Sequence, residues 1–209
     1  MLLSWRHYMH ISEGVLSPPV LALGGVITVA GTAMGLKHLD GEKIMTTALL
    51  TSTFFVASLI HVPVGPANVH LILSGLMGIT LGWACFPAIL TALFLQVLFF
   101  QYGGFTVLGV NTANMAVPAI ICYLLFRPLL TSGKKGQKVA AFASGFIAVL
   151  LGTLFMAGSL FASDQQFFNT AKLVCIAHIP LMFIEGIITM FAVTFLAKVQ
   201  PEFLQLKTK

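Results

Sequence analysis

Charged residues are scarce in this sequence. Only 8% of its 209 residues are Asp, Glu, Lys or Arg, whereas 58% are hydrophobic. A soluble domain carries roughly 25% charged residues, because its surface must face water. Six acids and eleven bases cannot cover such a surface, so a soluble enzyme is excluded. The net charge of +5 would suggest a nucleic-acid partner only in a soluble chain, and none is expected here.

Several functional motifs are absent as well. The sequence has no G-x-x-x-x-G-K-[ST], so the chain cannot bind and hydrolyse ATP through a P-loop. It has no H-E-x-x-H, which argues against a metalloprotease of that type, and no arginine ladder of a voltage sensor. Its three cysteines lie far apart without a C-x-x-C, so neither a disulfide framework nor a thiolate zinc site is expected.

Long apolar runs separated by Pro, Gly or charge predict an all-α polytopic membrane protein with about seven transmembrane helices in a lipid bilayer. The loop His61–Asn68 separates the second helix from the third. No internal repeat and no second domain are evident, so residues 9–209 are expected to form one transmembrane domain after a short extension, residues 1–8. The predicted helices are Pro18–Leu36, Ile44–Ile60, Val69–Ala84, Phe86–Phe100, a segment ending near Arg127, one between Lys138 and Phe161, and one between Ala171 and Ala197.

The positions of the bases predict the orientation. With seven spans, nine bases fall on one side and only Arg6 and Lys172 on the other. Because basic residues are retained on the cytoplasmic side, the N-terminus is expected outside and the C-terminus in the cytoplasm, in the cell (inner) membrane. The nine are Lys37, Lys43, Arg127, Lys134, Lys135, Lys138, Lys198, Lys207 and Lys209.

The six histidines are unevenly distributed on this topology. Only His38 falls on the cytoplasmic side, and the other five belong to the outer half: His7, His10, His61, His70 and His178. Neutral imidazole suits nickel, cobalt, zinc and copper, and converging rings can make a site. A single histidine is more often a hydrogen-bonded structural residue. As a group, these histidines make metal capture and a structural role about equally probable interpretations.

Few other polar side chains could support a site. Glu13 follows His10 by three positions and could orient a ring, or simply cap or face water. Glu185 lies in the last apolar run, seven residues after His178 and on nearly the same helical face. A buried acid should face the bundle interior, as a structural polar clamp or as an ion ligand. Five amide side chains could fix loops from within: Asn68, Asn111, Asn114, Gln96 and Gln101.

Glycines recur at helical spacing in the first and third predicted helices. Gly31 and Gly35 share one face of the first helix, and Gly75 and Gly78 one face of the third. Small residues let helices approach closely in lipid. These faces therefore predict internal packing or, alternatively, a docking surface for another membrane subunit.

Three alternative functions are compatible with these features. A haem held between two histidines would make the chain a redox protein. Glu185 could serve a self-sufficient proton-coupled metal transporter. A structural scaffold would bind no metal.

A set of short motifs resembles the cobalt and nickel substrate-binding membrane components of energy-coupling-factor (ECF) transporters, the CbiM/NikM family. Any one of them would be weak, but together they cover nearly the whole chain in the right order. The motifs are Met9-His10-Ile11-Ser12-Glu13-Gly14, Val62-Pro63-Val64-Gly65-Pro66, Val69-His70-Leu71, Leu95-Gln96, Gln101-Tyr102-Gly103-Gly104, Leu108-Gly109-Val110-Asn111, Ala177-His178-Ile179-Pro180 and Ile184-Glu185-Gly186-Ile187-Ile188-Thr189.

The resemblance implies that the N-terminal segment folds into the outer face and builds a metal site from nitrogens. The implied ligands are Met9, His10 and His70, with Co²⁺ or Ni²⁺ as transported substrate and no organic cofactor. Less directly implied accessory residues are His7, Glu13, His61, Asn68, His178 and Glu185. The implied partners are a second membrane scaffold, a cytoplasmic ABC-type ATPase pair and a small accessory membrane subunit.

The sequence departs from the family pattern at Met9, which follows eight other residues. In the family the starting Met supplies a terminal amine, whereas an internal amide must lose its proton before it can bind a metal. Either Met9 is the mature N-terminus, which we favour, or another group such as His7 takes its place. The loop after Val64 lacks a Ser-Cys-Ser-His run, so the choice between cobalt and nickel stays open.

Overall fold

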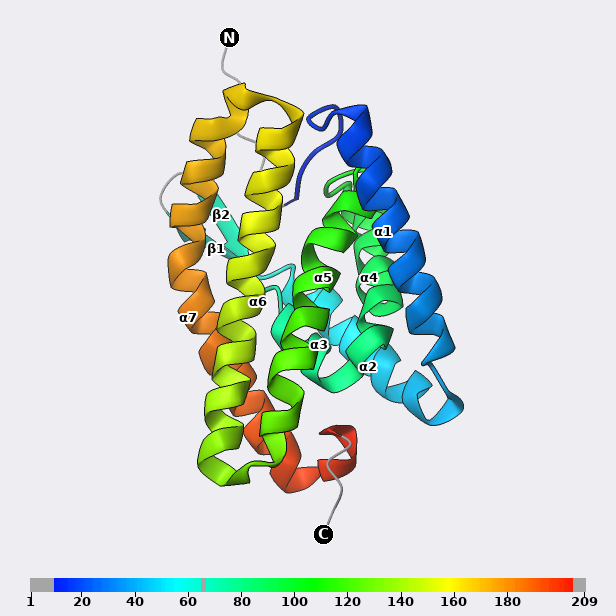
Figure 1. The fold of residues 1–209 in the computed structure, drawn as a ribbon, viewed down its shortest axis with the longest axis vertical. Helices are drawn as coiled ribbons and strands as arrows, with labels where there is room; N and C mark the ends of the chain where they lie inside the picture. The colour runs from blue at the N-terminus through cyan, green and yellow to red at the C-terminus, as the bar shows by residue number, and fades with distance from the viewer. Residues whose placement is uncertain (1–9, 65–66, 205–209) are drawn as a thin grey trace.

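The computed structural model describes residues 10–64 and 67–204, and within them the chain forms one bundle of α-helices (Figure 1). The helices are α1 (Pro18–Lys37), α2 (Gly41–Ala57), α3 (Ser74–Leu81), α4 (Cys85–Phe100), α5 (Leu108–Phe126), α6 (Gly133–Ser163) and α7 (Phe168–Val199). Helices α1, α5, α6 and α7 run along the long axis of the bundle, whereas the short α3 lies near its middle (Figure 1).

This architecture confirms the all-α membrane fold. Five described segments are long and apolar enough to cross a membrane, and α2 is a shorter apolar helix. Many large apolar side chains, such as Val29, Met45 and Phe191, are exposed on the outside of the bundle, where lipid would cover them. The five segments are Pro18–Lys37, Ser74–Phe100, Leu108–Thr131, Gly133–Ser163 and Gln165–Val199.

The region around the third predicted helix differs from expectation. The predicted loop contains an antiparallel hairpin of β1 (His61–Val64) and β2 (Ala67–His70), in which His61 and His70 are opposite each other. Helix α3 begins only at Ser74 and has 8 residues, about 12 Å of helix, so it is too short to span a membrane alone. It meets α4 at Gly82, whose positive φ of 56° turns the chain sharply.

The small-residue faces are buried inside the bundle. Thr28 Oγ1 on α1 donates a hydrogen bond of 2.6 Å to the Gly109 carbonyl at the start of α5. A side chain at Gly31 would collide with the Phe86 ring on α4, and one at Gly78 would collide with the backbone of Ala119 on α5. These contacts favour internal packing over docking as the role of both faces.

Replacing Gly78 with alanine tests this close approach. We expect a loss of roughly 1–3 kcal/mol in stability, because the new methyl group must push α3 away from the α5 backbone. The measurement is the thermal unfolding midpoint in detergent. Gly158→Ala on α6 is the matched control, since nothing lies within 4 Å of its added methyl group. Equal midpoints for the two variants would contradict the packing argument.

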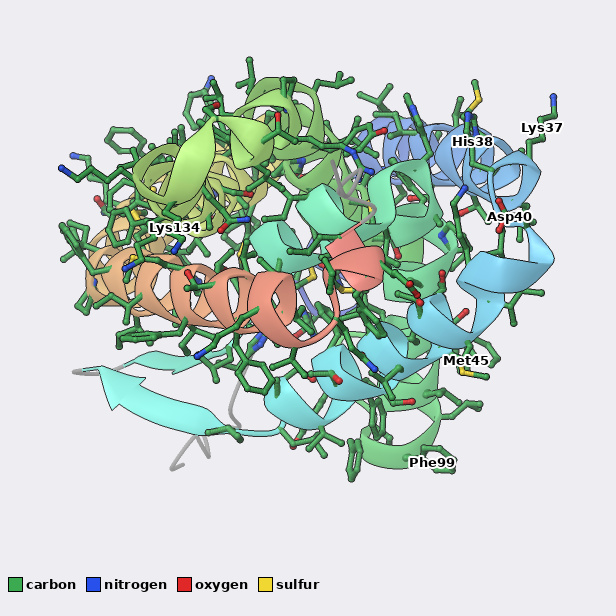
Figure 2. The ribbon with its side chains drawn as sticks, turned by 90° about the horizontal axis from the view of Figure 1, so that it is seen from below. Lys37, His38, Asp40, Met45, Phe99 and Lys134 are labelled. Carbon is green, nitrogen blue, oxygen red and sulfur yellow. The ribbon has the colours of Figure 1, made fainter. Side chains whose placement is uncertain are left out.

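The described bases other than Lys172, which lies near the start of α7, gather at one end of the bundle (Figure 1). Lys37 ends α1, and Lys134 lies in the first turn of α6. Figure 2, seen from this end, shows Lys37, His38 and Asp40 on one side and Lys134 on the other. Asp40 caps α2, and its hydrogen bonds to the Lys43 ammonium and backbone N–H lower the pKa of its carboxyl group. This one-sided distribution fits the predicted orientation, which itself stays a prediction.

Candidate metal centre

The segment before α1 lies on the end of the bundle opposite the bases. Ile11 and Leu16 are buried in a small apolar cluster with Val107, Val110 and Leu160. The Asn111 side-chain amide donates a hydrogen bond of 3.1 Å to the Ile11 carbonyl, and the Glu13 carboxylate accepts one of 3.2 Å from the Thr106 N–H. These contacts hold His10 at the bundle interior, where it is 7% exposed.

A chain of hydrogen bonds fixes the His10 ring. Ser58 Oγ donates to the Phe55 carbonyl at 2.7 Å, so it accepts from Gln96 Nε2 at 2.5 Å. The other amide atom, Gln96 Oε1, therefore faces His10 Nε2 at 2.9 Å. Because a carbonyl oxygen only accepts, Nε2 of His10 carries the proton and Nδ1 carries the ring lone pair.

His70 is the last residue of β2, and its ring has the opposite tautomer to that of His10. Its Nδ1 donates to the Leu71 carbonyl at 2.9 Å, which leaves the lone pair on Nε2. The ring is 5% exposed, and its centre lies 5.2 Å from the centre of the His10 ring at an interplanar angle of 68°. Two residues 60 positions apart in sequence thus bring imidazoles together in the same buried region.

Glu185 on α7 anchors the segment that carries His70. Its carboxylate accepts hydrogen bonds from the N–H groups of Ile72 and Leu73, the latter at 3.0 Å to each oxygen. Leu73 has a positive φ of 50° and precedes α3, whose first N–H groups lack partners within the helix. A carboxylate at a helix N-terminus is electrostatically favoured, so Glu185 acts as the structural clamp that the sequence suggested.

A cavity of about 50 Å³ extends inward from the two imidazoles. It lies between α5, α6 and α7, and His178 on α7 lines it too. His178 Nδ1 donates to the Val174 carbonyl at 2.8 Å, so its lone pair is also on Nε2. The complete lining is His10, His70, Ile72, Ser74, Asn111, Asn114, Met115, Ala148, Gly152, Thr153, Met156 and His178.

The predicted site residues divide into three groups. His10, His70 and His178 line one cavity, whereas Glu13 and Glu185 hold the surrounding backbone. His61 lies opposite His70 in the hairpin, and Asn68 opposite Pro63, but their side chains lie outside the described part of the chain. His7 and Met9 also lie outside the described residues.

The donor set within the described residues is small. Among the side chains that the structure describes, which exclude that of His61, no group of three His, Cys, Asp or Glu is close enough to hold a metal ion. The described part therefore offers one pair of close imidazoles. The further nitrogens implied by the family pattern, those of Met9 among them, stay a prediction.

Two of the alternative functions find little support in this geometry. An organic ligand site usually has roughly 300 Å³ or more, so a cavity of about 50 Å³ does not favour haem. The Glu185 carboxylate is occupied by two backbone N–H groups, which favours an anchoring role over proton coupling.

Sequence reasoning singled out Gln96 and Asn111 only as amides that could fix loops, and it missed Ser58, Met115 and Met156. Gln96 is fully buried between His10 and Ser58. A glutamine within an otherwise apolar run was the available signal for Gln96, whereas Ser58 carried none.

This fold and site define a polytopic membrane protein with a pair of buried imidazoles suited to a transition-metal ion. Residues 10–203 match the family model described as the cobalt uptake substrate-specific transmembrane region, CbiM. The chain belongs to this family, whose members are membrane components of cobalt and nickel uptake.

Relatives and solved structures agree with this assignment. The chain is 45% identical to a "Putative metal transport protein" of Haemophilus influenzae, covering 93% of this chain and 96% of that protein. It is 32% identical to the cobalt transport protein CbiM of Clostridium tetani, covering 91% and 85%. A crystal structure of a truncated transition metal transporter superposes with a TM-score of 0.78 at 26% identity, covering 91% of this chain and 99% of that one.

Proposed function

We propose that this chain captures Co²⁺ or Ni²⁺ at an extracytoplasmic site for an ATP-driven importer, with His10 Nδ1 and His70 Nε2 as ligands. The observation that carries the proposal is the close pair of buried imidazoles with hydrogen-bond-fixed tautomers. Met9 nitrogen is the further ligand that the family pattern implies.

The ring separation is compatible with one shared ion. A nitrogen ligand lies about 2.0–2.1 Å from a divalent metal, which places the ring centre roughly 3.2 Å from the ion. Two rings on the same ion, at angles from perpendicular to opposite, are then roughly 4.5–6.4 Å apart. The observed 5.2 Å lies within this range.

The ligand chemistry supports a transition metal as substrate. Imidazole nitrogen suits nickel and cobalt, whereas magnesium and calcium prefer oxygen ligands. The Gln96 carbonyl and the Leu71 carbonyl each accept from the second ring nitrogen, which is the usual way of orienting metal-binding histidines.

The energy source is proposed to lie in other subunits, because the sequence contains no P-loop. The proposed partners are an ECF membrane scaffold, a cytoplasmic ABC-type ATPase pair and a small accessory membrane subunit. A nickel transport relative, 36% identical over 52% of this chain, is named as a fused NikMN protein, so it joins a second component to its own chain. Inward release requires a form of lower affinity, and displacing the His10 segment would provide one.

Intact mass spectrometry of the purified chain, titrated with Co²⁺ and Ni²⁺, tests the proposal. We expect one tightly bound metal ion per chain and an N-terminus at Met9. A chain that retains no metal at any concentration would contradict metal capture. A metal-loaded chain that begins at Met1 would contradict Met9 amine ligation but not the imidazole pair.

The hydrogen bond between His10 and Gln96 gives a prediction about metal affinity. Replacing Gln96 with leucine removes the acceptor that fixes the His10 tautomer, so metal affinity should fall by about 10–100-fold. Gln166→Leu is the matched control, since Gln166 is exposed beyond the end of α6. Calorimetric titration measures the affinity of both variants for Ni²⁺. Equal affinities would show that Gln96 does not orient His10 for metal binding.

A further inference from the structure

The inner part of the cavity lacks an assigned role. It reaches Asn114 and Met115, which lie one turn further along α5 than Asn111. On α6 it extends from Met156 to Ala148, the middle residue of that helix. The space therefore runs from the imidazole pair near one end of the bundle to about half its depth.

The lining contains several polar side chains, although the interior of a transmembrane bundle is normally apolar. Ser74 Oγ and Asn114 Nδ2 are buried in this lining, and neither has a hydrogen-bond partner among the residues that the structure describes. Ser74 is only 1% exposed. A buried polar atom without a partner is costly, so water must satisfy these groups, and the cavity is expected to be hydrated. Polar groups inside a membrane bundle commonly mark a substrate pathway.

The remaining lining residues carry ligands for a soft or borderline metal. His178 contributes the Nε2 lone pair, and Met115 and Met156 contribute thioether sulfurs. The whole cavity, including the space beside His10 and His70, has about 50 Å³, which is room for roughly three water molecules at about 10–15 Å³ each. An ion with part of its hydration shell therefore fits within the cavity.

We propose that this inner cavity is a second station for the transported ion, in which His178 Nε2 is the principal ligand and Met115, Met156 and water complete the shell. This inference rests on the proposed function, since the ion reaches the inner station from His10 and His70. The occupant is a divalent transition-metal ion, Co²⁺ or Ni²⁺. The inner station binds more weakly than the outer pair, because it offers one imidazole and otherwise neutral, weak donors.

Disabling the outer pair isolates the inner station. Three full-length proteins are compared by equilibrium dialysis with Co²⁺ in detergent: the wild type, His10→Ala/His70→Ala, and the same double variant with His178→Ala. We expect the double variant to bind one Co²⁺ per chain at least about 100-fold more weakly than the wild type. Adding His178→Ala should abolish this residual saturable binding.

The matched control adds His38→Ala to the double variant, because His38 is exposed at the opposite end of the bundle (Figure 2). This control should bind like the double variant. Identical cobalt binding by the double and the His178→Ala triple variant would overturn the inner station and leave the proposed function intact. Wild-type affinity in the double variant would instead overturn the proposed function, and the inner station with it.

A second measurement avoids dependence on the folding of these variants. Crystals of the wild-type chain soaked in Co²⁺ are examined by anomalous scattering at the cobalt edge. A peak beside His178, separate from any peak at His10 and His70, supports the station. A peak at the outer pair alone would overturn it.

Discussion

Replacing His70 with alanine is expected to lower the affinity for Ni²⁺ and Co²⁺ by more than about 100-fold, the upper end of what losing a supporting group costs. The reason is that His70 supplies one of the two close imidazoles, so its loss leaves His10 as the single ring of that pair. Calorimetric titration of the purified chain measures the change.

The control for His70 is His38→Ala, whose exposed ring donates to the Met34 carbonyl far from the cavity. Its affinity should equal that of the wild type. If His70→Ala bound nickel as tightly as His38→Ala, His70 would not be a ligand. A matching thermal midpoint for the two variants would show that any difference in affinity is not a consequence of unfolding.

The second large effect is expected at Glu185. Glu185→Ala leaves the N–H groups of Ile72 and Leu73 without their acceptor in the bundle interior. Each buried, unsatisfied polar group costs about 1–3 kcal/mol, so the loss of stability should be roughly 2–6 kcal/mol. Because the same segment carries His70, metal affinity should fall too.

Glu185→Gln should lie between the wild type and the alanine variant, since its amide retains one acceptor oxygen. Glu202→Ala is the matched control, as Glu202 is exposed after α7. Thermal unfolding in detergent and nickel titration measure the two consequences. An alanine variant as stable as the Glu202 control would contradict the clamp.

The helices themselves were predictable because apolar length decides what can cross a bilayer. The predicted Pro18–Leu36 and Phe86–Phe100 differ from α1 and α4 by at most one residue at either end. Helices α6 and α7 extend beyond the predicted Lys138–Phe161 and Ala171–Ala197, because their polar ends continue the helix past the apolar run. Local composition carries this information without knowledge of tertiary contacts.

The start of α3 was not predictable from local composition. The apolar run after Asn68 predicted a helix from Val69, yet residues 67–70 pair with 61–64 in the hairpin. The chain then turns at Leu73, whose N–H is held by a carboxylate 112 positions away in sequence. A contact at that sequence distance overrides local preference, and the sequence gives no direct sign of it.

The candidate site was predictable only in part, for the same reason. Histidine placement pointed to five outer histidines, and the family resemblance selected His10 and His70 among them. The hydrogen bonds that fix their tautomers depend on Gln96, Ser58 and a backbone carbonyl, which only the folded chain brings together. The inner cavity combines residues of α5, α6 and α7 and has no local signature.

The central claim is that His10 and His70 hold the same metal ion. X-ray absorption at the nickel edge, with less than one equivalent of Ni²⁺ bound to the wild-type chain, tests it most directly. We predict a first shell of nitrogen ligands with outer-shell scattering from two imidazole rings, one of which disappears in His70→Ala. An oxygen-only shell without imidazole scattering, or a spectrum unchanged by His70→Ala, would contradict the account.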